Sequence, residues 1–144
     1  MLEKMEAMVR DHDVCVLATA SEGKPHCSLM AYLPDESCRE IYMVTHRSTK
    51  KYRNLIQNPT ISLLIDTRAS RSDGSRTEAE ALTVAGLFEE IEDRERLRRV
   101  RAEFLKRHPS MDHFMSHPDA VMMCIKISSF LLLEGLMEAH FETL

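Results

Sequence analysis

The chain has 144 residues and a formal net charge of −4 at neutral pH, and 44% of its residues are hydrophobic and 29% charged. This size and composition are typical of one globular domain, so residues 1–144 are expected to form a single domain. The negative net charge argues against a general nucleic-acid binder, and no apolar run approaches the roughly 20 residues that a membrane span needs.

The first elements are a short helix and a β-hairpin. Apolar residues recur on one face of residues 1–11, which predicts a helix, and the apolar run at 14–19 predicts a strand. Residues 21–25, with Gly23 and Pro25, predict a turn, and 26–33 predict the second strand of a hairpin. A further turn at 34–37 leads into a strand at 41–46.

A strand-to-helix corner follows. Helical spacing of apolar residues resumes after Val44, Ser48 is a candidate N-cap, and Asn58-Pro59 predicts the end of a helix over 48–57. Hydroxyl and cationic side chains therefore gather where free amides and the positive end of a helix dipole point outward. They are Thr45, Arg47, Ser48, Thr49, Lys50 and Lys51. This pattern fits a phosphate site, and it fits equally well a capped surface helix with solvated lysines.

The second half contains three more predicted strands and a helix. A strand is predicted at 60–66 and another at 81–91, where Gly86 indicates a bulge or the close approach of another group. Between them lies a polar loop at 67–79, whose arginines either cover an anion or are solvated. Asp93 is expected to cap a helix that runs through Arg107. Apolar runs at 120–127 and 130–136 predict two strands, with Ser128-Ser129 as a tight turn or a bend in one strand.

These elements amount to six or seven short strands and three helices. Consecutive strands joined by tight turns favour antiparallel pairing, and several strands are apolar on both faces. This combination fits a small closed barrel whose outer surface packs against helices or another subunit.

The cysteines and histidines give weaker signals. Cys15, Cys27, Cys38 and Cys124 form no C-x-x-C pair, which predicts reduced thiols; together with a start that lacks the apolar core of a signal peptide, this predicts a cytoplasmic protein. Cys27 is expected to be buried and inert, with a redox thiol as the alternative. His113 and His117 have the spacing of a metal pair but no third ligand, so no metal is assigned. His26 and His46 are candidate proton donors or structural histidines.

The order and spacing of these segments resemble the FMN-binding split-barrel proteins, the superfamily of pyridoxamine 5′-phosphate oxidase. The similarity rests on 16–19 with 23–26, on 42–45 through Lys50-Lys51 to Asn58-Pro59 and 61–64, on 84–86 with 89–91, and on 104–109 with 118–120. The resemblance implies a mainly β fold with flanking helices, a six-stranded antiparallel split β-barrel. It also implies a homodimer with FMN between the subunits.

The resemblance also implies a cofactor site. Lys51 falls at the family's phosphate-binding lysine, Lys50 where many members have Arg, Thr49 where they have Ser, and Thr45 at the threonine that closes the third strand. The second strand would face the flavin, although Ser28 stands where oxidases carry an arginine. The implied cofactor-binding residues are His26, Ser28, Leu29, Met30, Thr45, His46, Arg47, Ser48, Thr49, Lys50 and Lys51.

The family's activities narrow the expected function. Members that oxidise pyridoxamine phosphate end in a segment containing Trp and Arg, whereas this chain has no Trp and ends with residues 137–144. The resemblance therefore implies an FMN-dependent oxidoreductase that uses NAD(P)H or another donor on a small-molecule substrate other than pyridoxamine phosphate. The alternative is non-catalytic binding or storage of FMN, FAD, a deazaflavin or haem. A haem-binding subgroup has a Gly-rich, His-containing C-terminal loop, of which Gly135 and His140 remain here.

Overall fold

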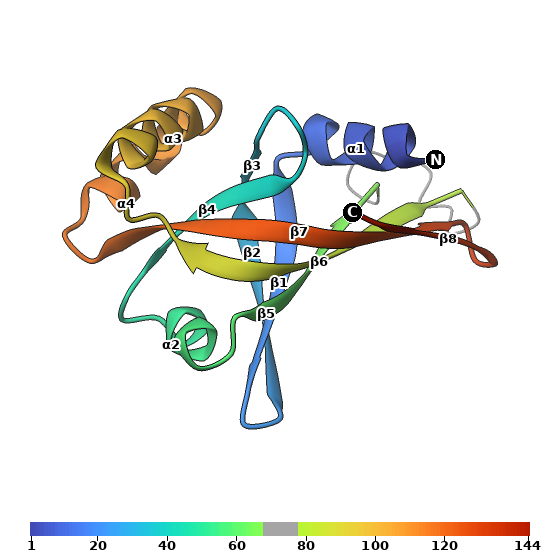
Figure 1. Ribbon diagram of the computed structural model, residues 1–144, viewed down its shortest axis with the longest axis horizontal. Helices are drawn as coiled ribbons and strands as arrows, with labels where there is room; N and C mark the ends of the chain where they lie inside the picture. The colour runs from blue at the N-terminus through green and yellow to red at the C-terminus, as the bar shows by residue number, and fades with distance from the viewer. Residues whose placement is uncertain (68–77) are drawn as a thin grey trace.

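A computed structural model of the chain describes residues 1–67 and 78–144. It consists of one curled antiparallel sheet with helices packed around it (Figure 1). The strands are β1 (Val14–Ser21), β2 (Lys24–Ala31), β3 (Leu33–Pro34), β4 (Glu40–His46), β5 (Thr60–Asp66), β6 (Glu80–Glu90), β7 (Ala120–Glu134) and β8 (Glu138–Thr143). The helices are α1 (Leu2–Asp11), α2 (Lys50–Gln57), α3 (Arg94–Arg107), the 3₁₀-helix η2 (Pro109–Met111) and α4 (Asp112–Ser116).

The sheet has the order β2-β1-β5-β6-β7-β4-β3, and β8 also pairs with β7. β7 is the long strand that joins the two halves of the sheet. β6 lies along one of its edges, while the first part of the other edge pairs with β4 and the last part with β8. The sheet curls until β2 approaches β4. The predicted class, a mainly β antiparallel split barrel with flanking helices, is confirmed.

The main core fills the concave side of the sheet beneath α1. Met5 and Val9 of α1 are fully buried, and they join a cluster that includes Leu17 of β1, Leu63 of β5 and Phe130 of β7. Alternate residues of β1 and β5 are buried, as expected for strands with one face on a core. The helix at the start of the chain therefore closes the open side of the half-barrel.

A second apolar cluster explains why two strands are apolar on both faces. Tyr42 of β4 and Met122 of β7 point to the convex side of the sheet, where they pack with Val100 and Phe104 of α3 and Met115 of α4. Figure 1 shows α3 and α4 together at this end of the sheet. The expectation that helices cover the outside of the barrel is thus met for β4 and the first part of β7.

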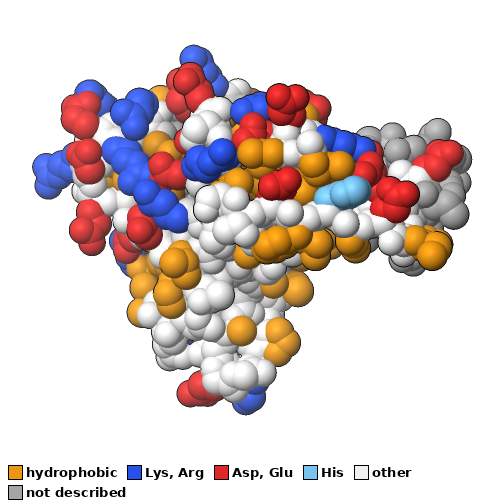
Figure 2. Space-filling view, turned by 45° about the vertical axis from the view of Figure 1, so that its right-hand side comes forward, with side chains coloured by type: hydrophobic (Ala, Val, Ile, Leu, Met, Phe, Trp, Pro, Cys, Tyr) orange, Lys and Arg blue, Asp and Glu red, His pale blue; other side chains and the backbone are white. Residues whose placement is uncertain are grey.

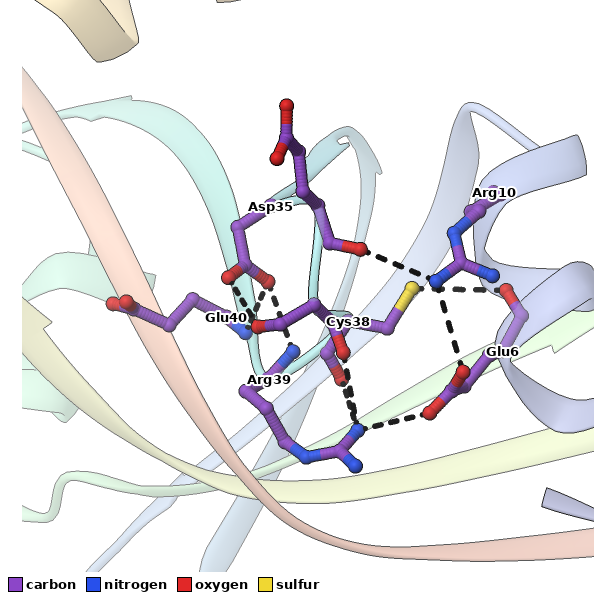
Figure 3. A network of polar contacts seen from close by, with 8 residues as sticks. Glu6, Arg10, Asp35, Cys38, Arg39 and Glu40 are labelled. Carbon is purple, nitrogen blue, oxygen red and sulfur yellow. Dashed lines mark hydrogen bonds and ion pairs between the residues drawn. The ribbon is translucent and has the colours of Figure 1, made fainter. Parts of the chain in front are cut away.

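Polar contacts attach α1 to the loop between β3 and β4 (Figure 3). Arg39 donates to Glu6 Oε1 at 3.0 Å, and Arg10 lies 3.6 Å from Glu6 Oε2. Asp35 Oδ1 accepts the Arg39 amide at 2.9 Å, which closes the loop, and Cys38 occupies a left-handed conformation with φ of 54°. The two arginines are 47% and 44% exposed, whereas Glu6 is 17% exposed. Because the arginine partners are open to solvent, we expect these contacts to orient the helix more than to stabilise it.

The end of the chain differs from its prediction. The run at 120–127 and the run at 130–136, except for its last two residues, form one strand, β7, in which Ser128 is a bulge. The register shifts between Ala85 and Gly86 of β6, and Ser128 Oγ donates to the Ala85 carbonyl. Of the two readings left open, the bend is therefore right and the tight turn wrong. The predicted bulge or close approach at Gly86 is confirmed.

Four elements were not predicted. No strand was predicted for residues 137–144, yet β8 pairs with β7 along its whole length. β3 has two residues, η2 has three and α4 has five, and these lengths are too short for a periodic signal. The described part of the chain therefore has eight strands instead of the six or seven predicted from the sequence and the six implied by the resemblance. The predicted loop at 67–79 lies almost wholly outside the described residues.

Candidate functional site

The strand-to-helix corner after β4 is built around two threonines. Thr45 is buried, and its hydroxyl lies 3.0 Å from that of Thr49. Thr49 Oγ1 also donates to the His46 carbonyl at 2.8 Å and accepts the Tyr52 amide at 3.3 Å. Thr49 is therefore the N-cap of α2, and the prediction of Ser48 was wrong. Either hydroxyl can cap a helix, and the buried Thr45 beside Thr49 determines which one does.

The first two residues of α2 leave cationic and amide groups available. The backbone amides of Lys50 and Lys51 donate to no acceptor among residues 1–67 and 78–144, as expected at a helix start. The Lys51 side chain is half-buried, burial lowers the pKa of its ammonium, and it has no counter-ion within those ranges. Lys50 is exposed. An unpaired, partly desolvated ammonium beside free helix amides favours an anion.

The two lysines do not point to the same place. Lys50 lines a polar hollow of about 480 Å³ between α2 and the β1–β2 hairpin, together with Lys24 and Arg53. Lys51 is absent from this lining and lies one helical turn before Leu55, which is in the core. Asn54 fixes the helix on the hairpin, because its buried amide donates to Thr19 Oγ1 at 3.1 Å.

Three predicted residues of the corner already have protein partners. The His46 ring stacks on Phe114 with centroids 4.0 Å apart and on His117 at 4.8 Å. Arg47 forms an ion pair with Glu90 at 2.6 Å. The Ser48 amide donates to Asp119 Oδ2 at 3.0 Å, and this hydrogen bond lowers the pKa of Asp119. These residues hold the corner against β6, α4 and the loop before β7.

The predicted flavin-facing strand, β2, alternates along its length. Met30 is buried in the core, and His26 and Ser28 lie on the same side of the strand and are half-buried. Leu29 points the other way and is 76% exposed. Cys27 is exposed on that same side, so its predicted burial was wrong. β2 is the last strand of the sheet at its end of the order, so one of its backbone edges is not paired with another strand.

The convex side of the sheet carries an uncharged row that crosses six strands. The register places in one line Leu29 of β2, Val16 of β1, Leu64 of β5, Thr83 of β6, Leu131 of β7 and Phe141 of β8. We call these six residues the exposed sheet row. Leu29 and Phe141 at its ends are 76% and 63% exposed. An apolar band of this length is typical of a surface that another protein covers.

Sequence reasoning missed some charged residues and overrated others. Lys24 and Arg53 join Lys50 in the polar hollow; Arg53 is signalled by its spacing of three residues on the helix, whereas Lys24 needs the tertiary fold. His117 Nδ1 accepts the Asp119 amide at 3.0 Å, so this ring has a structural contact.

Within the described ranges, the cluster able to hold a metal is Glu134, Glu138 and His140 and does not include His113. In the same ranges, no helix is long and apolar enough to cross a membrane.

Comparison with known proteins places this geometry in context. A model of the pyridoxamine 5′-phosphate oxidase family matches residues 1–133. A comparison with curated proteins gave no match.

Solved structures share the fold at low sequence identity. A heme binding protein from Mycobacterium smegmatis is 22% identical with a TM-score of 0.84; the match covers 98% of this chain but 57% of that one. A FAD-binding protein from Mesorhizobium loti is 17% identical with a TM-score of 0.75, and the match covers 92% of this chain and 93% of that one. HutZ, the heme storage protein from Vibrio cholerae, is 16% identical with a TM-score of 0.74, with 92% of each chain covered.

Proposed function

The chain belongs to the pyridoxamine 5′-phosphate oxidase family, and from that premise we propose that it is a flavin-binding oxidoreductase that holds FMN between two copies of itself. The reaction passes electrons from NAD(P)H or another donor to a small acceptor other than pyridoxamine phosphate. When bound, the flavin supplies the hydride or electron transfer; the chain's residues bind it, orient it and exclude water.

The observation that carries the proposal is the ammonium of Lys51, which has no counter-ion among residues 1–67 and 78–144. Holding a cation half-buried without a counter-ion costs free energy, because burial disfavours the charged form. A phosphate removes that cost, and the free amides of Lys50 and Lys51 add hydrogen-bond donors on the same helix turn. Thr45 and Thr49 hold each other and the helix start, so we assign them a positioning role rather than a contact with the phosphate.

The remaining residues fit a flavin with one difference. His26 and Ser28 are half-buried on one side of β2, which pairs with β1 and is the last strand at its end of the sheet order; this side suits a flat ring, and Met30 lies beneath it in the core. Ser28 offers a hydroxyl where the resemblance leads one to expect an arginine, so more of the phosphate's charge must be balanced by Lys51 and Lys50. The polar hollow is lined by three cations, Lys24, Lys50 and Arg53, and by one carboxylate, that of Glu22, so its net charge is positive on the approach to this corner.

The exposed sheet row supports the two-copy arrangement. A site that depends on an edge strand is open to water unless a second molecule covers it, and Leu29 belongs both to that strand and to the row. A symmetric dimer through this face would bury the row and place the β2 strands of the two copies at the interface. The row is uncharged from β2 to β8, so burying it leaves no unpaired ion.

Titration of the ligand-free protein with FMN tests the function, with riboflavin as a matched ligand that lacks only the phosphate. We expect one FMN per chain, a visible flavin spectrum, and riboflavin affinity at least about 100-fold weaker, corresponding to about 2.8 kcal/mol. Loss of the flavin absorbance on anaerobic addition of NADPH or NADH then supports an oxidoreductase. Equal affinity for the two ligands, or no saturable binding of either, contradicts the proposal.

Haem binding is the second candidate, because two of the structural relatives are named for haem. Addition of haemin in place of FMN separates the two functions. A saturable Soret band that FMN does not displace favours haem storage, and a flavin complex that reacts steadily with NADPH excludes a purely storage role.

Replacing Leu29 by glutamate is expected to convert the dimer to a 16.6-kDa monomer, because the new charge would be desolvated in the exposed sheet row. Leu29 is largely exposed within one chain, so the substitution should leave the fold intact. We expect the dimer dissociation constant, measured by light scattering or sedimentation, to rise about tenfold or more. Ile56→Glu on α2 is the control, since Ile56 is 60% exposed and lies outside the row. A Leu29→Glu protein as dimeric as this control would refute the assignment of the face.

A further inference from the structure

Three glutamates stand side by side near the far end of the sheet. The register pairs Glu80 of β6 with Glu134 of β7, and Glu134 with Glu138 of β8. Directly opposed like charges on neighbouring strands destabilise a sheet. Within residues 1–67 and 78–144 one ammonium, that of Lys4 from α1, lies among them and pairs with Glu80 at 2.6 Å and with Glu134. With His140 neutral, the group of three carboxylates and Lys4 keeps two uncompensated negative charges.

His140 adds a nitrogen ligand on the same side of the sheet. It is two residues after Glu138 on β8, and its Nε2 lies 2.9 Å from Glu134 Oε1. That nitrogen is buried, and within residues 1–67 and 78–144 the Glu134 carboxylate is the polar group it faces. Glu134 thus presents Oε2 to Lys4 and Oε1 to His140, and the Lys4 contact lowers the pKa of Glu134, which keeps the carboxylate ionised.

The arrangement has the donors and the spacing of a metal site. The ligand atoms of Glu134, Glu138 and His140 all lie within 4.8 Å of one another. Ligands about 2.1 Å from a tetrahedral zinc ion stand roughly 3.4 Å apart, so rotation of the exposed Glu138 side chain is enough to complete the set. Figure 2 shows Asp and Glu side chains next to a His side chain on one face of the molecule.

We propose that Glu134, Glu138 and His140 bind a divalent cation of the zinc class, a site separate from the corner after β4. One imidazole and two carboxylates favour zinc, or cobalt and nickel, over magnesium and calcium, which prefer oxygen ligands alone. The ion supplies the two positive charges that Lys4 leaves unbalanced. It also joins β8 to β7 beside the hairpin turn, so zinc stabilises the last strand of the sheet.

Calorimetric titration of tag-free, EDTA-treated protein with ZnCl₂ tests the proposal, with MgCl₂ as the comparison. We expect one zinc per chain, and affinity reduced about 10- to 100-fold or more in His140→Gln and in Glu138→Gln, since loss of even an outer-shell partner costs that much. Cobalt should give visible d–d absorbance that disappears in the same variants.

Two controls separate this cluster from other ligands on the chain. The double variant His113→Gln/His117→Gln removes the histidine pair near α4, and Cys27→Ser removes the exposed thiol. Both should bind zinc as the unmodified protein does. Zinc binding that survives in His140→Gln but is lost in either control overturns the proposal, as does the absence of saturable zinc binding. None of these outcomes depends on FMN, so the flavin proposal stands or fails separately.

Discussion

Replacing Lys50 and Lys51 together by alanine is expected to weaken FMN binding by roughly a few kcal/mol, or about 100-fold or more, if the phosphate pairs with both ammonium groups away from water. The two single variants should differ. Lys51 is half-buried and unpaired, so its removal should account for most of the loss, whereas the exposed Lys50 should contribute less than about 1 kcal/mol. Fluorescence titration of the ligand-free protein measures both.

Two comparisons show whether the loss arises at the phosphate. Lys106→Ala removes a lysine that is 79% exposed on α3, and should bind FMN normally. Riboflavin affinity should be nearly the same in the double variant and the unmodified protein, because that ligand has no phosphate. If the double variant binds FMN unchanged, or loses riboflavin to the same extent, then the phosphate lies elsewhere.

The affinity for FMN should also depend on pH, and the burial of Lys51 determines the direction of that dependence. Burial lowers the pKa of its ammonium, so Lys51 loses its charge at a lower pH than an ordinary lysine does. FMN affinity should therefore be highest below that pKa and decline as the pH rises through it. Lys51→Arg keeps its charge over this range, and its affinity should stay level. A decline of equal size in Lys51→Arg would assign the titration to another group.

Most of the sheet could be predicted from the sequence, because the signals are local. The hairpin turn between β1 and β2 is Glu22-Gly23, inside the predicted turn at 21–25, whose last two residues already belong to β2. The helix signals after Val44 separate β4 from β5, and Asp93 accepts the Glu95 amide at 3.2 Å as an N-cap. Gly86 was correctly assigned to a bulge or a close approach, since a glycine inside a strand has few other reasons to be there. In each case, one or two neighbouring residues carry the information.

What the sequence could not predict depends on contacts between distant residues. Thr49 caps α2 in place of Ser48 because Thr45, on the preceding strand, reaches it. Lys24 lines the same hollow as Lys50 only after the hairpin has folded against α2. The line of Glu80, Glu134 and Glu138 is determined by the register of three strands, and for one of these, β8, no strand was predicted.

Gly86→Val is expected to be the most destabilising single change in the sheet. A Cβ atom at position 86 would lie 2.5 Å from the Lys126 carbonyl oxygen and 2.9 Å from Ile125 Cγ2. The first of these is backbone in the middle of β7, so no side-chain rotation relieves the clash. We expect Gly86→Ala to cost about 1–3 kcal/mol of unfolding free energy and valine to cost more, measured by urea denaturation.

Gly23, in the turn between β1 and β2, allows the steric cost of a glycine substitution to be distinguished from its conformational cost. Gly23 has a φ of 74°, but a Cβ atom there meets nothing within 4 Å, so Gly23→Ala should cost only the roughly 1–2 kcal/mol of a left-handed residue. Gly23→Asn should recover part of that loss, because asparagine tolerates this conformation, whereas no side chain should rescue position 86. If Gly86→Ala is as stable as Gly23→Asn, then β7 can move away from position 86 at its Ser128 bulge. The close distance between β6 and β7 at this position is then not fixed.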